Sequence, residues 1–379
     1  MNSWERASGT QLIMEDSLRV ELLEGSRPSL QWVLLLVLSA VCVVILKFLR
    51  LPAALLLGPM VAGIVIAVLG GTPRIAPWGF QLSQALIGCM MARAIPHSFG
   101  GQIAKQAPIF LISTFGVLAV SGLLGWLLTR WRVFPGSAAV WGSWPGAATA
   151  MVLLSDAHGA DARLVAVMQY MRVLLVAVVA SVVARIAIVP TGSAAAVQQP
   201  TGIQWLPLTA GLAIVLAGFF IARWTRLTAG ALLVPLVLSF ALQGMGRVNV
   251  ELPQPMLAVG YAVIGWSVGL RFTRPVLHYA AGRLPWIVAS SLLLIAACGV
   301  IAVALDKVTG MGLLAAYLAT SPGGADSIAI IAASGHVDMG FVMAFQTSRF
   351  VAILLVGSRL TRFIARHAVP FKDPRADTR

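Results

Sequence analysis

The sequence predicts an all-α integral membrane protein, with about 10–12 transmembrane helices in two homologous repeats and paired Pro-Gly helix breaks. Three observations predict this class: the composition, a succession of apolar segments, and an internal register between the two halves. The 379 residues are 59% hydrophobic and only 11% charged, with a mean hydropathy of +0.90. Soluble domains carry about 25% charged residues, so this chain has too little polar surface to coat a globule in water. Lipid is the solvent that fits.

The charge balance is strongly basic, with 27 Lys and Arg against 13 Asp and Glu and a net charge of +14. In a soluble protein this excess would suggest nucleic acid. In a membrane protein, basic residues gather at helix ends and in cytoplasmic loops, so the expected partner is the lipid bilayer, with no direct contact to nucleic acid. The three cysteines lie apart and the five histidines show no ligand spacing, so we expect no metal and no cofactor.

The chain divides by its apolar segments, each of which needs about 20 residues to cross a bilayer. The first ~28 residues are polar and of mixed charge, unlike the basic start and apolar core of a secretory signal. We therefore expect a polar N-terminal tail (1–30), a first membrane repeat (31–189), a linker (190–203), a second membrane repeat (204–365) and a basic C-terminal tail (366–379). Apolar segments lie near 31–49, 52–71, 79–95, 107–129, 134–155, 162–189, 204–222, 228–246, 255–270, 284–305, 310–334 and 340–365.

A shift of 177 residues lays the first half on the second. Rare polar residues match as well as common apolar ones, which chance rarely produces, and internal duplication is common in membrane transporters. The matched pairs include Ile87-Gly88 with Ile264-Gly265, Pro145-Gly146 with Pro322-Gly323, Asp161 with Asp338, Gln169 with Gln346, and Arg172 with Arg349. The basic clusters favour halves that point the same way, but the arginines near the C-terminus disagree. The choice between parallel and inverted repeats stays open.

A Pro-Gly pair interrupts an apolar segment in each half. Proline removes a backbone donor and glycine holds a helix poorly, so each pair predicts a broken helix. Inside lipid, such a break is tolerated only where protein or water satisfies the freed backbone groups, and paired breaks indicate a site near the midplane. A packing kink is the structural alternative. The candidate substrate-binding residues of the breaks are Pro145, Gly146, Pro322, Gly323 and Gly324.

A polar stripe follows each break on the next helix. Asp161 and Asp338 come just before long apolar runs, which favours a role as N-caps over a functional one. Arg172 and Arg349 lie about ten residues into their helices, where a charge costs about 2.5–3.5 kcal/mol on insertion scales.

Each arginine follows a glutamine at i−3 on the same face of its helix. Gln169, Arg172, Gln346 and Arg349 are therefore candidate substrate-binding residues. The structural alternative is an anchor bonded to the carbonyls of the broken helix.

Two further features mark where the halves differ. Asp326 is the one acidic residue just after a Pro-Gly-Gly break, and is a candidate to bind a proton, a cation, or one of the two arginines. A structural ion pair explains it equally well. Trp141 and Trp144 flank the first break and could line a pocket, although packing or interfacial tryptophans are commoner.

Several of these segments together resemble a known family. The stretch from Leu55 to Gly63, the run from Gln84 to Gly88, the Pro-Gly-Gly-Ala segment and the Gln-x-x-Arg helix are similar to the AbrB family of duplicated bacterial membrane proteins. The likeness covers about residues 30–367. It implies a multi-pass protein of the bacterial inner membrane, and the family name implies regulation of gene expression. Members are also labelled ammonia monooxygenases, but no facial triad, haem motif or dinucleotide loop supports that label here.

These observations lead to two expected functions. The first is a secondary transporter or permease for a small, anionic solute, which an arginine-lined cavity would bind through charge-assisted hydrogen bonds. The alternative is a membrane-embedded regulator of gene expression that acts through a partner. An enzyme is not expected. The identity of the solute and the coupling ion stay open, and the sequence is compatible with a homo-oligomer.

Overall fold

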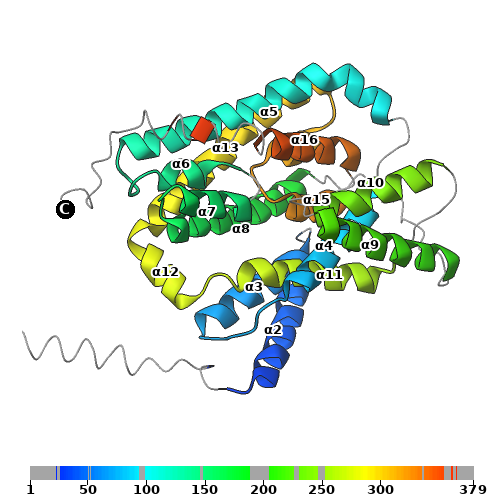
Figure 1. Cartoon of the computed structure of the whole chain (residues 1–379), viewed down its shortest axis with the longest axis horizontal. Helices are drawn as coiled ribbons and strands as arrows, with labels where there is room; N and C mark the ends of the chain where they lie inside the picture. Colours follow the sequence, from blue (N-terminus) through cyan, green and yellow to red (C-terminus); the bar gives the residue numbers. More distant parts are fainter. Residues whose placement is uncertain are drawn as a thin grey trace, which may run out of the picture.

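The computed structural model describes residues 23, 26–49, 51, 53–93, 99–145, 148–187, 205–225, 230–245, 252–334, 337–353, 360–361 and 364. Within these ranges the secondary structure is helical throughout, as the sequence predicts (Figure 1). The first half contains α2 (Pro28–Phe48), α3 (Ala54–Val68), α4 (Pro77–Arg93), α5 (Phe99–Arg130), α6 (Ala138–Ser143), α7 (Ala148–Ala157) and α8 (Ala162–Ala187). The second contains α9 (Trp205–Thr225), α10 (Gly230–Gly244), α11 (Gln254–Gly269), α12 (Arg274–Ala280), η1 (Ala281–Arg283), α13 (Leu284–Thr309), α14 (Leu313–Thr320), α15 (Ala325–Ser334) and α16 (Met339–Ala352).

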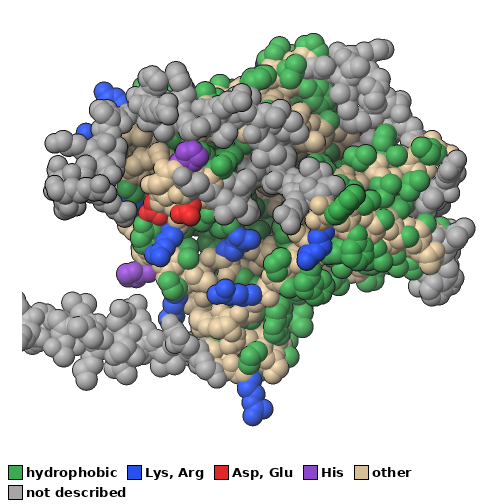
Figure 2. Space-filling view, in the orientation of Figure 1, with side chains coloured by type: hydrophobic (Ala, Val, Ile, Leu, Met, Phe, Trp, Pro, Cys, Tyr) green, Lys and Arg blue, Asp and Glu red, His purple; other side chains and the backbone are tan. Residues whose placement is uncertain are grey.

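Long apolar helices make this a membrane protein. In the described part of the chain, five helical segments are long and apolar enough to cross a bilayer: 28–48, 108–130, 162–186, 207–224 and 274–309. Large apolar side chains lie exposed along these helices, and Figure 2 shows hydrophobic surface over much of one edge of the molecule. In water such a surface would be costly, whereas lipid tails cover it without penalty.

The breaks fall where the sequence predicts them, and other boundaries differ. The apolar segments 134–155 and 310–334 each contain two helices, α6 with α7 and α14 with α15. The expected apolar segment 107–129 matches the candidate span Pro108–Arg130, and α5 extends it back to Phe99 with Pro108 inside the helix. The turn from α13 to α14 is set by Gly310 and Gly312, whose φ angles of 65° and 92° suit glycine alone. Asp306 accepts a hydrogen bond from the backbone N–H of Gly312 at 2.9 Å.

Helices of one half pack closely on helices of the other. In the first half, α4 packs on α10 of the second, and in the second half α11 packs on α3 of the first. Both contacts depend on a glycine: a Cβ atom at Gly88 would lie 2.1 Å from the carbonyl oxygen of Leu232, and one at Gly265 would lie 2.5 Å from that of Leu56. Small residues allow helices to approach this closely in lipid.

The long helices α5 and α13 lie side by side, and each contacts several other helices (Figure 1). Helix α5 also packs on α6 and α16, and α13 also packs on α8 and α14. Each long helix therefore contacts one broken segment and one helix of the polar stripe. The core around the first break contains Trp141 and Trp144, both fully buried, so the packing interpretation of these tryptophans is correct.

Candidate functional site

Each break begins at the residue before proline. Trp144 precedes Pro145 and adopts φ −67° and ψ 123°, while Ser321 precedes Pro322 and adopts φ −57° and ψ 136°. The proline ring disfavours the helical region for its predecessor, so the chain becomes extended at both positions. Helices α6 and α14 therefore end at the break, and their last carbonyl groups lack helical partners.

A glutamine from the next helix satisfies the carbonyls of the first break. The Nε2 atom of Gln169, on α8, lies 3.1 Å from the carbonyl oxygen of Trp141, 3.4 Å from that of Gly142 and 3.2 Å from that of Trp144. Because the Gln169 side chain is completely buried, no water competes for these acceptors. The amide thus caps the C-terminal end of α6.

Gln346 of α16 makes the corresponding contacts in the second half. Its Nε2 atom lies 2.7 Å from the carbonyl oxygen of Leu318, 3.3 Å from that of Ala319 and 3.4 Å from that of Ser321. The donor and all three acceptors are 177 residues after those of the first break. The common evolutionary origin of the halves stays a prediction, but the capping geometry recurs at the predicted interval.

The arginines complete both caps. Arg172 donates through one guanidinium nitrogen to the carbonyl oxygens of Gly142 (3.1 Å) and Ser143 (3.3 Å), and through the other to Oε1 of Gln169 (2.5 Å). This geometry is the structural alternative given above, in which the arginine is an anchor bonded to the carbonyls of the broken helix. The bond to Gln169 also fixes that amide with its nitrogen toward the carbonyls.

Arg349 caps the second break in the same manner. It donates to the carbonyl oxygens of Thr320 (3.5 Å), Ser321 (2.6 Å) and Gly323 (3.2 Å), and to Oε1 of Gln346 (2.5 Å). Arg172 and Arg349 are only 2% and 3% exposed, so both guanidinium groups face the protein interior.

Aspartates fix the starts of the two helices that carry these pairs. Asp161 Oδ1 accepts from the backbone N–H of Leu164 at 3.1 Å, and Asp338 Oδ1 accepts from that of Phe341 at 3.0 Å. In each case the donor is the third residue of the helix, which is the N-cap geometry. The N-cap prediction is confirmed for both residues. Asp161 also accepts a hydrogen bond from the hydroxyl of Tyr279, on α12.

The site concentrates positive charge in the protein interior. The acceptors described above for the two guanidinium groups are carbonyl and amide oxygens, and none is a carboxylate. The Nε atoms of Arg172 and Arg349 are buried without a hydrogen-bond partner among the described residues. The side chain of Asp326, the predicted ion-pair partner, lies outside the described residues.

Helix α8 links the two breaks. A Cβ atom at Gly323 would lie 2.7 Å from Cγ1 of Val176, so the second break packs against the helix that caps the first. Pro145 and Pro322 are described and buried, Gly324 is half-buried, and Gly146 lies outside the described residues. A direct approach of the two Pro-Gly segments stays a prediction, as does the binding of substrate by any of these residues.

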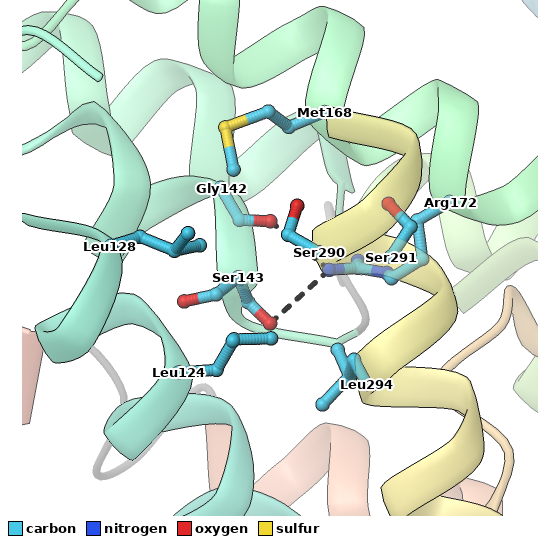
Figure 3. A pocket seen from close by; sticks show the side chains of 9 residues that line it. All are labelled: Leu124, Leu128, Gly142, Ser143, Met168, Arg172, Ser290, Ser291 and Leu294. Carbon is cyan, nitrogen blue, oxygen red and sulfur yellow. Dashed lines mark hydrogen bonds between the residues drawn. The ribbon is translucent and has the colours of Figure 1, made fainter. Parts of the chain in front are cut away.

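A small cavity beside Arg172 includes residues that the sequence analysis missed. It lies between α5, α6, α8 and α13 (Figure 3). Ser290 and Ser291 of α13 form part of its wall, next to Ser143 and Arg172. The 177-residue register offered one signal, because it pairs these serines with Ser113 and Thr114 of α5. Hydroxyl residues are common in membrane helices, so that signal alone is weak.

Comparisons with known proteins identify the family of the chain. The model of a family described as "Transition state regulatory protein AbrB" matches residues 55–365. The chain is 41% identical over 348 residues to an Escherichia coli (strain K12) protein named "Putative regulator AbrB", covering 90% of this chain and 98% of that relative. No solved structure matches. The family model spans both breaks, both Gln-Arg pairs and most of the helices that hold them, and the chain therefore belongs to the AbrB family of membrane proteins.

Proposed function

We propose that this protein is a secondary transporter for a small, anionic solute, and that it lies in the inner membrane of a bacterium as a multi-pass protein. The observation that carries the proposal is the pair of broken helices, each capped on its carbonyl end by a buried Gln-Arg pair. Broken helices near the bilayer centre are typical of transporters that bind their substrate where the helices are interrupted. No catalytic step is assigned.

The positive charge supports an anionic solute. Two guanidinium groups lie buried, and the acceptors described for them carry no full negative charge. Helices α7 and α15 also begin at the breaks, so the positive ends of their dipoles face the same region. An anion that enters between the breaks would meet partial and full positive charges and few competing acceptors.

The caps also define how the arginines act. Their guanidinium groups already bind carbonyl oxygens and so fix the ends of α6 and α14. Their positive charge would act on the solute through its electrostatic potential, without direct contact. Direct solute contact would come from the N-terminal ends of α7 and α15. In this arrangement, the substitution Arg349→Ala lowers stability as well as transport.

The test is flux into liposomes that contain the purified protein. A panel of small mono- and dicarboxylates is screened by solid-supported membrane electrophysiology, and each active compound is followed by radiolabelled counterflow. We expect saturable, protein-dependent uptake of at least one compound. If none of the panel is taken up by protein that remains folded, the proposal of a transporter for a small, anionic solute is wrong.

A matched pair of glycine variants separates transport from folding. In Gly323→Ala the added Cβ presses on Val176 at the second break, whereas in Gly299→Ala the Cβ meets nothing within 4 Å. We expect uptake to fall in the first variant and to persist in the second, at equal amounts of protein in the membrane. Equal uptake by the two variants would contradict a role for the break.

A membrane-embedded regulator is the second candidate, because the names of the family and of the relative state regulation. In this case the protein would act through a partner that binds nucleic acid. A transcript profile of a deletion strain, complemented with a transport-dead variant, distinguishes the two. If the transport-dead variant reverses the transcript changes of the deletion strain, regulation is independent of transport. If only the active protein reverses them, the result supports transport.

A further inference from the structure

The cavity beside the first break is small and partly open. Its volume is about 10 Å³, counted as the space open to the centre of a water molecule, which is room for about one water-sized particle. Apolar side chains of α5, α8 and α13 form one part of its wall. Arg172, Ser143, Ser290 and Ser291 form the polar part, and Figure 3 shows the guanidinium group of Arg172 directed toward the serines.

The polar wall contains hydrogen-bond donors as well as the carbonyl groups of Gly142 and Ser143 that accept from Arg172. Two nitrogens of Arg172 are engaged by the cap, but its Nε–H is buried and has no acceptor among the described residues. Ser290 and Ser143 donate to carbonyls of their own helices, at 3.0 and 3.1 Å, and a hydroxyl can leave such a bond by rotation. Among the described residues that line the cavity, a particle would therefore meet N–H and O–H groups and the backbone of Gly142 and Ser143, but no carboxylate.

The charge at this place calls for an anion. Arginine keeps its proton, so Arg172 cannot lower the cost of burial by becoming neutral. Arg349, which caps the second break, is a second buried positive charge. A water molecule would satisfy the free Nε–H but leave both charges uncompensated, whereas a monovalent anion would satisfy the donor and neutralise one of the two charges.

The second half provides a natural control. At the corresponding place, Ser113 and Thr114 lie on α5, which packs on α16. Aromatic rings occupy this region: Phe110 stacks on Phe345 with ring centroids 4.1 Å apart. Phe345 stands at the register position of Met168, which lines the cavity of the first half. The buried Nε–H recurs at Arg349, and the stacked ring of Phe345 stands at the register position of the cavity residue Met168.

We propose that the cavity beside the first break holds one small inorganic anion of chloride size, bound by the guanidinium group of Arg172 and the hydroxyls of Ser290 and Ser291. The anion acts as a resident counter-ion of the buried arginine pair. The site does not depend on the proposed transport, because the charge needs compensation in a transporter and in a regulator alike.

The test measures the thermal stability of the full-length protein in detergent. Melting temperatures are compared in sodium chloride, sodium bromide and sodium gluconate at equal ionic strength. We expect chloride and bromide to raise the melting temperature by about 2 °C or more, in a saturable manner. The variant Ser290→Ala/Ser291→Ala should lose most of this rise. The matched variant Ser113→Ala/Thr114→Ala removes the corresponding hydroxyls of the second half and should keep it.

Bromide soaked into crystals of the unmodified protein gives a readout that needs no variant. Anomalous density beside Arg172 would support the site. A cavity that holds water only, with no bromide signal and equal melting temperatures in chloride and gluconate, would overturn it. A chloride-dependent rise that survives in Ser290→Ala/Ser291→Ala would overturn it too. If the unmodified protein shows no solute uptake in liposomes but chloride still raises its melting temperature, the transport proposal is wrong and the anion site stands.

Discussion

Alanine at Gly88 should force α4 away from α10. A Cβ atom at this position would lie 2.1 Å from the carbonyl oxygen of Leu232 and 3.1 Å from its carbon. A carbon atom and a carbonyl oxygen normally stay about 3.3–3.6 Å apart, so the two helices must separate by about 1.2 Å. The obstacle is backbone, which cannot rotate aside as a side chain can.

The cost follows from that separation. A gap of 0.5–1 Å already loses about a quarter to a half of each dispersion contact along the interface, and overpacking of this kind costs about 1–3 kcal/mol or more. Alanine returns at most about 1 kcal/mol through its better helix propensity. We expect Gly88→Ala to lower the free energy of unfolding by about 2 kcal/mol. Gly265→Ala should act alike, because its Cβ would lie 2.5 Å from the carbonyl oxygen of Leu56.

The assay is the melting temperature of a fluorescent fusion in detergent, followed by size-exclusion chromatography. Gly299→Ala is the control, since it replaces a glycine of a long membrane helix where the Cβ meets nothing within 4 Å. It should melt at or slightly above the temperature of the unmodified protein. If Gly88→Ala melted together with Gly299→Ala, the close approach of α4 and α10 would be refuted.

Three further predictions concern the caps and the contact between halves. Arg349→Ala should lower stability by about 2–4 kcal/mol, because several carbonyls lose a charged donor, and Gln346→Leu should cost about 1–3 kcal/mol; unchanged melting of either variant would exclude capping. Asp338→Ala should cost about 1 kcal/mol and Asp338→Asn much less, since asparagine also caps, so equal melting of the two would contradict the N-cap role. Trp266→Phe should cost about 1 kcal/mol through the lost 2.9 Å bond to Ser39, and chemical denaturation should show no cost if Ser39 is already alanine.

Local chemistry made much of the site predictable. Proline constrains its predecessor and glycine holds a helix poorly, so the breaks at Pro145 and Pro322 could be placed from the residues alone. An aspartate before a long apolar run is a strong N-cap signal, which gave Asp161 and Asp338. A charge within a membrane helix must face protein or water, so the inward direction of the arginines followed from their depth.

Tertiary packing set what the sequence did not reveal. The glycines Gly88 and Gly265 matched in the internal register, but a glycine indicates a close approach without naming the partner helix. The serines Ser290 and Ser291 looked like ordinary hydroxyls of a membrane helix, and only the position of α13 against α8 places them beside Arg172. The apolar segment 107–129 gave the membrane-spanning part of α5, but not the turns from Phe99 to Pro108 that precede it.

The packing of α4 on α10 between the two halves imposes an order on biosynthesis. Helix α4 ends at Arg93 and its partner α10 begins at Gly230, so the ribosome must add about 140 residues before the two can meet. At about 5–20 residues per second, this takes roughly 7–28 seconds. Throughout that interval the Gly88 face of α4 lacks the contact with α10 that it makes in the complete protein. The first half therefore lacks the helix on which α4 packs until the second half is made. We expect a chain truncated after α8 to pair with a second copy or to be degraded.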